Sequence, residues 1–546
     1  MPEKNKKNLS ESMISFLRQR NSNYLLFFGL CLLVTGLPLS LFLTSLSQFF
    51  IVGSFFLEGN FKEKTRRFIN SKAAVLMVGF WLLHVIGLLW TQDFHEGIKD
   101  VRIKLPILFL PIVLSGSGAL QPKQFKTLLW LFILAVFSGS LVSMAVLKGF
   151  IHTRVPMYDI REIFILGVSH IRFALFTCLA VIVSVWLLNS RTNPLAPWIK
   201  FILVLMILWL VLFLFIIESV TGISVLLFIL IAFLLSIAFR HHSVFVRTLS
   251  IALLVAIPTT LFIFLKGFVQ KYSVTPIEVL QFDKKTKLGN SYFFDTTNTQ
   301  IENGYRVYFY ICDSELRTEW NKRSKIPFDS LDERKQPLKS TLIRFLTSKG
   351  EYKDAESVSR LTEEEIQSIE HGIANVYYQH LSSIKSRMLQ ILWEYKEYQR
   401  GGDPSGHSVT QRIEFWKAAL QIILEHPLTG VGTGDMPAAY REAYSKMNTK
   451  LMEKYRLRAH NQYLAIGVGL GIPVLLYFLF TLIYPLAERI RKRDILFLSF
   501  WLIFFISMFT EDTLETQAGA TFAALFWSLF LFSGENRFSQ TANKIR

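Results

Sequence analysis

The residues best suited to chemistry are a histidine and an asparagine at the junction of a polar and an apolar stretch. A long polar segment ends at His460 and Asn461, and an apolar run continues from there to Tyr484. If this run is a transmembrane helix, His460 lies at its first turn, where unpaired N–H groups and a positive dipole end bind anions and favour a neutral, basic imidazole. An interfacial histidine beside an asparagine cap fits the same position, so position alone leaves both interpretations open.

Two features upstream of His460 suit phosphate binding. Arg412 and Trp416 are four residues apart on a predicted helix and share one face, where a guanidinium can fork onto a phosphate with the indole beside it. A surface arginine on an amphipathic helix gives the same pattern. The glycine-rich run Gly430–Asp435 can bring backbone N–H groups to an anion, although a flexible turn that ends a helix is the more ordinary interpretation. It lacks the Gly-Lys-Ser/Thr ending of a nucleotide-binding loop, so we do not expect ATP binding.

Several charged residues flank the apolar runs on the side of His460. Arg102 and Lys104 precede the fourth run, and His170 and Arg172 lie at the start of the sixth. Charges at membrane depth are costly and tend to be functional or paired. We expect Lys104 to be a snorkelling or topology-setting cation, whereas Arg172 suits that role and a functional one equally. Acidic residues on the same side are expected to be structural partners of the arginines: Glu218, Glu511 and Asp512.

Signatures of other chemistries are missing from the sequence. There is no Asp-Xaa-Asp for a metal-bound nucleotide sugar, no zinc-type cluster and no Gly-Xaa-Ser-Xaa-Gly elbow. The three cysteines, Cys31, Cys178 and Cys312, lie far apart and predict neither a disulfide framework nor a thiolate metal site. Charges inside the apolar runs are scarce, which argues against an ion-coupled transporter. We therefore expect no metal and no other cofactor.

The composition is that of a membrane protein. The chain has 546 residues, of which 51% are hydrophobic and 49 are phenylalanine. A soluble chain of this length would not carry so many long apolar runs. The net charge of +18 predicts topology signals and attraction to anionic membrane lipids rather than nucleic-acid binding.

Twelve apolar runs predict transmembrane helices, although several are shorter than the ~20 residues of a straight span. They are Tyr24–Leu37, Leu39–Leu57, Ala74–Trp90, Leu105–Gly116, Phe125–Lys148, Ile171–Leu188, Ile199–Ile217, Gly222–Phe239, Phe245–Lys266, Gln462–Tyr484, Ile495–Met508 and Leu514–Phe532. The Gly36-Leu37-Pro38 break favours a hairpin for the first two runs. The basic N-terminus has no convincing cleavage site, so we expect an uncleaved first span.

The Lys/Arg bias of the short loops places both termini in the cytoplasm. Nine transmembrane helices then occupy residues 1–266, a large periplasmic loop domain residues 267–459, three helices residues 460–533 and a cytoplasmic tail residues 534–546. In the loop, Asn303-Gly304 predicts a hairpin turn, Thr362 with Glu365 predicts a capping box, and Val409–Glu425 predicts a helix. The predicted fold is an all-α polytopic membrane protein of about 12 transmembrane helices with one large, mostly helical periplasmic loop containing a small β-hairpin.

Taken together, the motifs resemble the O-antigen ligase superfamily, which also contains O-antigen polymerases and bacterial oligosaccharide-to-protein transferases. His460-Asn461, nine residues and Gly471 match its pattern of His, Asn/Ser/Gln, nine residues and Gly. Arg412 and Trp416 match its outer-loop Arg and Trp, and the run from His426 matches its His-Pro-Leu-x-Gly-x-Gly-x-Gly. One departure is the turn after the seventh run, residues 218–222, which lacks the arginine that many members carry. Either Arg172 or Arg102 supplies that charge, or the donor is held in a different way.

The resemblance implies a metal-independent glycosyltransferase in the bacterial inner membrane with its active face in the periplasm. It would move a glycan from undecaprenyl diphosphate to a hydroxyl of the lipid A-core or of another glycan. His460 and Arg412 are the implied catalytic residues, His460 as general base. The implied diphosphate-binding residues are Arg172, Arg102, His170 and Asn461. A polymerase or a transferase to protein from the same superfamily, a transporter or flippase, and a non-catalytic scaffold remain as alternatives.

Overall fold

The computed structural model describes residues 2–117, 120–151, 168–190, 194–240, 242–273, 283–298, 300–379, 381 and 383–533. The chain forms two compact units. The first comprises residues 1–233, 415–448 and 456–546, and the second comprises residues 234–414 and 449–455. The segment predicted as a single loop domain is therefore shared between them, because residues 415–448 and 456–459 pack with the apolar helices of the first unit.

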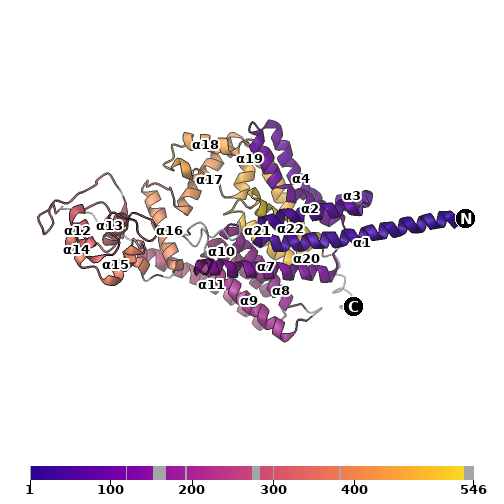
Figure 1. The fold of residues 1–546 in the computed structure, drawn as a ribbon, viewed down its shortest axis with the longest axis horizontal. Coiled ribbons are helices and arrows are strands. Elements are labelled where there is room, and N and C mark those ends of the chain that lie inside the picture. Colours follow the sequence, from indigo (N-terminus) through magenta and orange to yellow (C-terminus); the bar gives the residue numbers. More distant parts are fainter. Residues whose placement is uncertain are drawn as a thin grey trace. The chain divides into compact units, whose positions relative to one another are not determined.

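Apolar helices make up most of the first unit (Figure 1). They are α1 (Pro2–Leu39), α2 (Leu41–Glu58), α4 (Lys72–Ile86), α6 (Leu105–Gly116), α7 (Pro122–Leu147), α8 (His170–Leu188), α9 (Pro197–Ile216), α10 (Val220–Arg240) as far as residue 233, α19 (Gln462–Ile483), α21 (Ile495–Ser507) and α22 (Gln517–Phe532). The shorter elements are α3 (Phe61–Asn70), η1 (Gly87–Trp90), α5 (Phe94–Ile103), α17 (Ser408–Glu425) from residue 415, α18 (Met436–Lys446), α20 (Leu486–Arg491) and η5 (Thr513–Glu515).

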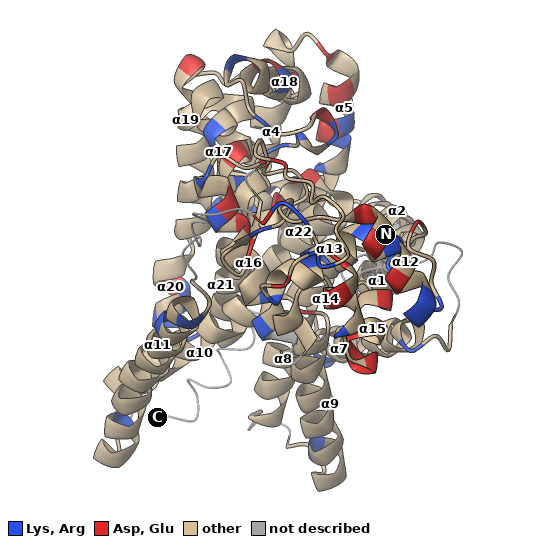
Figure 2. Ribbon diagram, turned by 90° about the vertical axis from the view of Figure 1, so that its left-hand side faces the viewer, with Lys and Arg blue, Asp and Glu red and all other residues tan. Residues whose placement is uncertain are grey.

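Nine helices of the described chain are long and apolar enough to cross a membrane, so this is a multi-pass membrane protein. In Figure 2, α9 is tan over nearly its whole length, whereas the connecting helix α5 carries both signs of charge. All twelve predicted runs are helical, but α6, α21 and α22 have only 12, 13 and 16 residues. Helix α22 is buried along almost all of its length and packs against α6 and α21. Enclosure by protein explains why α22 does not need the length of a lipid-facing span.

The first two predicted runs form the expected hairpin. Helix α1 ends at Leu39, and the side chain of Ser40 caps α2 by accepting a hydrogen bond from the backbone N–H of Leu43. The two helices lie side by side in Figure 1. Gly29 makes this close packing possible, because a Cβ added there would lie 2.8 Å from a side-chain atom of Ile51.

Helix α19, which begins directly after His460 and Asn461, is broken in the middle. Gly471 has a φ of 79° and a ψ of 174°, a conformation that side chains rarely adopt. The chain just after α17 fills the break, because the N–H of Ile472 donates to the carbonyl of Pro427 at 2.8 Å. The glycine that ends the predicted His-Asn-x9-Gly pattern is therefore the hinge of this helix.

The second unit contains the end of α10, helix α11 (Val244–Tyr272) and a mixed region of short elements. These are β1 (Ile301–Glu302), β2 (Tyr305–Arg306), α12 (Asp313–Arg323), α13 (Leu338–Ser348), α14 (Ala355–Ser359), α15 (Glu363–Glu370), η3 (Val376–Gln379), α16 (Ser383–Gln399), the start of α17 and η4 (Glu453–Tyr455). Trp320, Phe328 and Leu342 are fully buried in a small core of this region.

Several local predictions in the second unit are confirmed. Strands β1 and β2 pair antiparallel across Asn303-Gly304, and Thr362 and Glu365 form the capping box of α15. The strand after the turn is shorter than the β-rich sequence suggests. It ends at Arg306, although the N–H of the next residue, Val307, still donates to the carbonyl of Gln300 at 3.0 Å. Helix α12 was not predicted from the sequence, whereas α13 agrees with the helical pattern expected after Pro337.

Candidate functional site

His460 occupies a strained position directly before a helix. Its φ is 46°, in the left-handed region, and Asn461 caps the helix that follows by accepting a hydrogen bond from the N–H of Leu464 at 3.1 Å. The amide nitrogen of Asn461 also donates to the carbonyl of Phe509 at 3.0 Å. The cap therefore fixes the backbone that carries His460, while about a third of the His460 side chain is exposed.

The imidazole of His460 faces a buried carboxylate. Its Nδ1 lies 3.6 Å from Oδ1 of Asp512, a residue that is only 1% exposed. Two arginines contact the same carboxylate: Nε of Arg458 reaches Oδ2, and Nη2 of Arg172 lies 3.8 Å from Oδ1. Burial alone would raise the pKa of Asp512, but His460 and Arg458 outweigh it and hold the pKa below its ordinary value. Asp512 is therefore an anion that can orient the ring and stabilise a positive charge on it.

A second group of buried charges lies next to Asp512. Nζ of Lys104 donates to Oε2 of Glu515 at 2.9 Å and also contacts Asp100. The side-chain amide of Gln462 donates to Oε1 of Glu515 at 2.9 Å, so both oxygens of this carboxylate are occupied. Burial opposes ionisation, but the charges of Lys104 and Arg458 keep the pKa of Glu515 well below its ordinary value. This group ties α5, the start of α19 and η5 together.

The backbone just before His460 is held from two directions. The indole N–H of Trp416 donates to the carbonyl of Ala459 at 3.0 Å, and the N–H of Ala459 donates to the hydroxyl of Tyr440 at 3.2 Å. The ring of Phe415 lies 5.9 Å from the ring of His460. Helices α17 and α18 thus set the position of the histidine through its neighbour, and Trp416 has a supporting role that its spacing from Arg412 did not suggest.

The glycine-rich run is a packing element and not a free anion-binding loop. The N–H groups of Val431 and Gly432 donate to the carbonyls of Val468 and Gly469, each at 2.9 Å. A Cβ on Gly430 would lie 2.4 Å from the backbone of Gly469, so the run is held tightly against α19. The suggested anion contact through these N–H groups is therefore wrong. The run does follow the end of α17, as the more ordinary interpretation expects, and its backbone is bonded to α19.

The other predicted site residues lie in different surroundings. Arg172 pairs with Asp512, which agrees with the expectation that the acids on this side are partners of the arginines. Its Nη1 donates to the hydroxyl of Ser169 at 3.0 Å. His170 is the first residue of α8 and is half-buried. Arg102 is exposed on α5. Arg412 lies in the part of α17 that belongs to the second unit.

The expectation for Lys104 is wrong. A snorkelling or topology-setting lysine reaches water, but the Lys104 side chain is 1% exposed and is paired with Asp100 and Glu515. The two carboxylates around the ammonium of Lys104 offset the free-energy cost of removing it from water. The partner one helical turn earlier, Asp100, was visible in the sequence, whereas Glu515 is brought in by the fold.

Three residues of the site were not assigned to it from the sequence: Arg458, Asp512 and Glu515. The sequence indicates Arg458 only weakly, as the second of two arginines just before His460. Asp512 and Glu515 lie in the short turn between α21 and α22, where acids between two apolar helices are costly without a partner. The sequence predicts that Asp512 needs a cationic partner, but its contact with His460 depends on tertiary structure.

His460, Glu511 and Asp512 also bring three potential metal ligands within 4.8 Å of one another. The charges around them do not suit a cation, since Arg458 and Arg172 already contact Asp512. A divalent ion would have to displace both guanidinium groups or sit beside them. The donor set therefore fits a histidine–carboxylate pair better than a metal centre.

The fold and the site define a multi-pass membrane protein with a candidate proton acceptor and cations gathered at the start of a broken helix. Residues 371–479 match the family model described as O-antigen ligase. This match confirms the resemblance to the O-antigen ligase superfamily that the motifs of this segment carry. It supports a membrane glycosyltransferase of the O-antigen ligase or polymerase type. No curated protein matches the chain.

Proposed function

We propose that the protein transfers a glycan from undecaprenyl diphosphate to an acceptor hydroxyl at the periplasmic face of the bacterial inner membrane. The acceptor we favour is the lipid A-core, which makes the reaction an O-antigen ligation. The observation that carries the proposal is the contact of His460 with Asp512, a buried carboxylate that Arg458 and Arg172 also contact. The family match to residues 371–479 supports the same class of reaction.

In the proposed mechanism His460 acts as general base. It accepts the proton of the acceptor hydroxyl while the oxygen attacks the anomeric carbon, and the lipid diphosphate leaves with the electron pair of the broken bond. Asp512 acts as a positioning residue, because its carboxylate orients the imidazole and stabilises the imidazolium that forms. The capping hydrogen bonds of Asn461 occupy its amide, so we assign it to positioning His460 rather than to the diphosphate.

The leaving diphosphate requires positive charge. Arg172 is the cation that we place first, because it lies 3.8 Å from Asp512 and therefore close to His460. It is also our candidate for the arginine missing after the seventh span, since Thr221 of that turn lies 3.5 Å from Thr510, two residues before Asp512. Arg412, Arg102 and His170 remain predicted contributors. A diphosphate is already an activated leaving group, so the proposed reaction needs no nucleotide and no metal.

The test is transfer in vitro. Purified full-length protein is mixed with undecaprenyl-diphosphate-linked glycan and lipid A-core in the presence of a chelator. We expect product from the wild type, none from His460→Ala, and strongly reduced product from Arg172→Gln. His371→Ala serves as control, because this histidine is exposed in the second unit and should leave transfer unchanged.

Each contrary result has a defined meaning. Full transfer by His460→Ala would overturn the general-base assignment. Growth of the donor glycan without transfer to lipid A-core would replace ligation by polymerisation. Dependence on an added divalent ion would contradict the metal-independent mechanism.

A further inference from the structure

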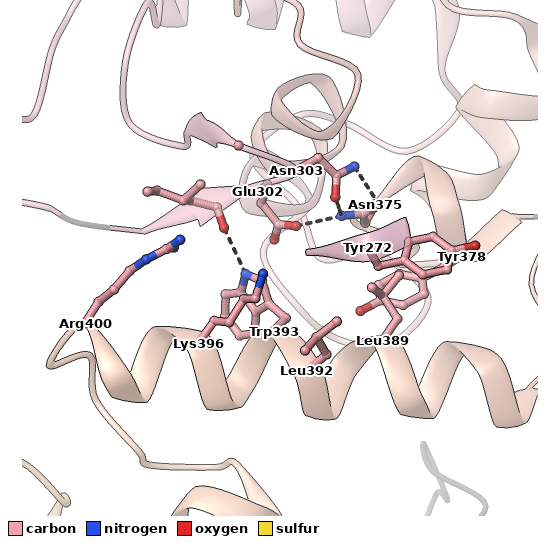
Figure 3. A pocket seen from close by; sticks show the side chains of 12 residues that line it. Tyr272, Glu302, Asn303, Asn375, Tyr378, Leu389, Leu392, Trp393, Lys396 and Arg400 are labelled. Atoms are coloured by element: carbon pink, nitrogen blue, oxygen red, sulfur yellow. Dashed lines mark hydrogen bonds between the residues drawn. The ribbon is translucent and has the colours of Figure 1, made fainter. Parts of the chain in front are cut away.

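A pocket in the second unit lies outside the proposed active site. Figure 3 shows side chains of α16 rising toward the β1–β2 hairpin, with tyrosines at one end of the pocket. Its lining combines aromatic residues, amides and cations, including Tyr272, Tyr378, Trp393, Lys396 and Asn303. Nothing in the proposed mechanism uses these residues.

The pocket lies at the end of a candidate membrane span. Tyr272 is the last residue of α11, which has 29 residues and is apolar enough to cross a membrane. At 1.5 Å per residue this helix is about 44 Å long, longer than the ~30 Å hydrocarbon core. One end of α11 therefore projects beyond the core, and the pocket lies within reach of a chain attached to a membrane lipid.

The aromatic wall of the pocket is rigid. The indole N–H of Trp393 donates to the carbonyl of Ile301 at 2.9 Å, and the guanidinium of Arg344 lies 5.6 Å from the centre of its ring. Tyr272 packs against Tyr377 with 5.3 Å between ring centres. Fixed aromatic rings with polar edges suit ligands that have apolar C–H faces and polar rims, and sugars are such ligands.

Most charged and amide groups that line the pocket have hydrogen-bond or ion-pair partners within the protein. Glu302 is neutralised by Arg344, with Nη2 at 2.5 Å from its Oε1, and accepts a hydrogen bond from Asn375 at 2.7 Å. Arg400, which also lines the pocket, pairs with Glu397 at 3.0 Å. These groups are therefore held in place before any ligand arrives.

Two polar groups of the lining have no partner within the described chain: the ammonium of Lys396 and the hydroxyl of Tyr378. Burial and the nearby Arg400 lower the pKa of Lys396, as expected for a cation that lacks an acidic neighbour. Burial raises the pKa of Tyr378 to about 12, so its hydroxyl stays protonated and can donate. A ligand with a negative charge and a neighbouring oxygen acceptor would satisfy both groups.

The size of the pocket limits what can enter. The pocket is a small concavity of about 480 Å³, a volume that includes space open to solvent. This is room for a carboxylate and a neighbouring hydroxyl, with the rest of the sugar ring outside against the aromatic rim.

We propose that this pocket binds the carboxylate-bearing edge of an acidic sugar residue in a glycan. Lys396 would pair with the carboxylate, Tyr378 would donate to a neighbouring oxygen, and Trp393 would support the ring. The inference rests on the proposed function only in taking a lipid-linked glycan as the physiological ligand. The binding site itself is argued from the side chains of the second unit.

The test is binding of tri-galacturonic acid to the full-length protein in detergent, measured by saturation-transfer NMR and calorimetry, with neutral galactotriose as the matched probe. We expect tri-galacturonic acid to bind and galactotriose to bind much more weakly. Lys396→Gln should weaken binding of the acidic probe by about tenfold or more, because a hydrogen bond to a charged group is lost. Tyr378→Phe should weaken it by a smaller factor. Lys385→Gln is the control, since this lysine is exposed on the same helix.

Three results would overturn the proposal: equal binding of the two probes, unchanged binding by a folded Lys396→Gln, or displacement of the sugar by inorganic phosphate at similar concentration, which would indicate a general anion site. A failure of the proposed transfer reaction is distinguishable, because binding is measured without donor or acceptor. His460→Ala should bind the acidic probe as the wild type does.

Discussion

Replacing Asp512 with asparagine removes one negative charge next to His460 while keeping the size of the side chain. The carboxylate lies 3.6 Å from Nδ1 of His460. At the effective dielectric constant of about 20 that suits such sites, its attraction for a full positive charge on the ring is about 5 kcal/mol. Arg458 and Arg172 draw on the same carboxylate, so the share felt by His460 is smaller. If the attraction felt by His460 is at least about 2 kcal/mol, its loss should lower kcat by a factor of between about 30 and about 10³.

The assay is the initial rate of glycan transfer by purified protein, with folding checked by thermal unfolding in the same detergent. Asp494→Asn is the matched control, because it removes another buried carboxylate that pairs with an arginine, Arg489 at 3.2 Å, away from His460. The control should lose stability but retain its rate per folded molecule. A folded Asp512→Asn protein with a rate within about threefold of the wild type would refute the reasoning. Equal rate losses in both variants would assign the effect to general destabilisation.

Further predictions concern the supports of the site. Gly471→Ala should destabilise the protein by about 2 kcal/mol or more, because the residue has a positive φ and an added Cβ would lie 2.4 Å from a backbone oxygen. Gly53→Ala is the control and should not destabilise the protein, because the space around Gly53 is open. Comparable thermal unfolding of the two variants would contradict this. Trp416→Phe should slow transfer and cost about 1 kcal/mol for its lost hydrogen bond, while Trp501→Phe should cost similar stability without slowing transfer. Equal transfer rates would show that the first bond does not position His460. Burial and Glu515 raise the pKa of Asp100 above its ordinary value, so its ionisation opposes folding as pH rises. Asp100→Asn also removes one of the two partners of Lys104, so the prediction concerns the pH dependence: its effect on the unfolding temperature should be more favourable at about pH 8 than at about pH 4, and the opposite order would reverse the assigned sign.

Much of the membrane part could be predicted from the sequence, because helix formation there depends on local apolar content. Every predicted run is helical, and the Gly36-Leu37-Pro38 break gives the expected hairpin. Length was the weaker criterion. Helices α6, α21 and α22 are short, and α22 is surrounded by protein, which hydrophobicity alone does not distinguish from lipid.

The candidate site was only half predictable. His460 and Asn461 were identifiable because a polar residue at the start of an apolar helix is a local feature. Their support is not local: Asp512 comes from the turn before α22, and Trp416 bonds to a backbone carbonyl rather than to another side chain. Side-chain types predict that such groups need partners, but the choice of partner depends on how the helices pack.

The break in α19 has a consequence for how the protein is made. Its carbonyls at Val468 and Gly469 accept hydrogen bonds from Val431 and Gly432, which are synthesised before α19 itself. In lipid an unsatisfied backbone group costs several kcal/mol, so the helix is complete only when the preceding loop has docked onto it. Insertion of α19 and assembly of the polar segment before it are thus a single event. A chain that fails to dock this loop would expose open backbone groups inside the bilayer, and quality-control proteases could recognise the misassembled chain by that defect.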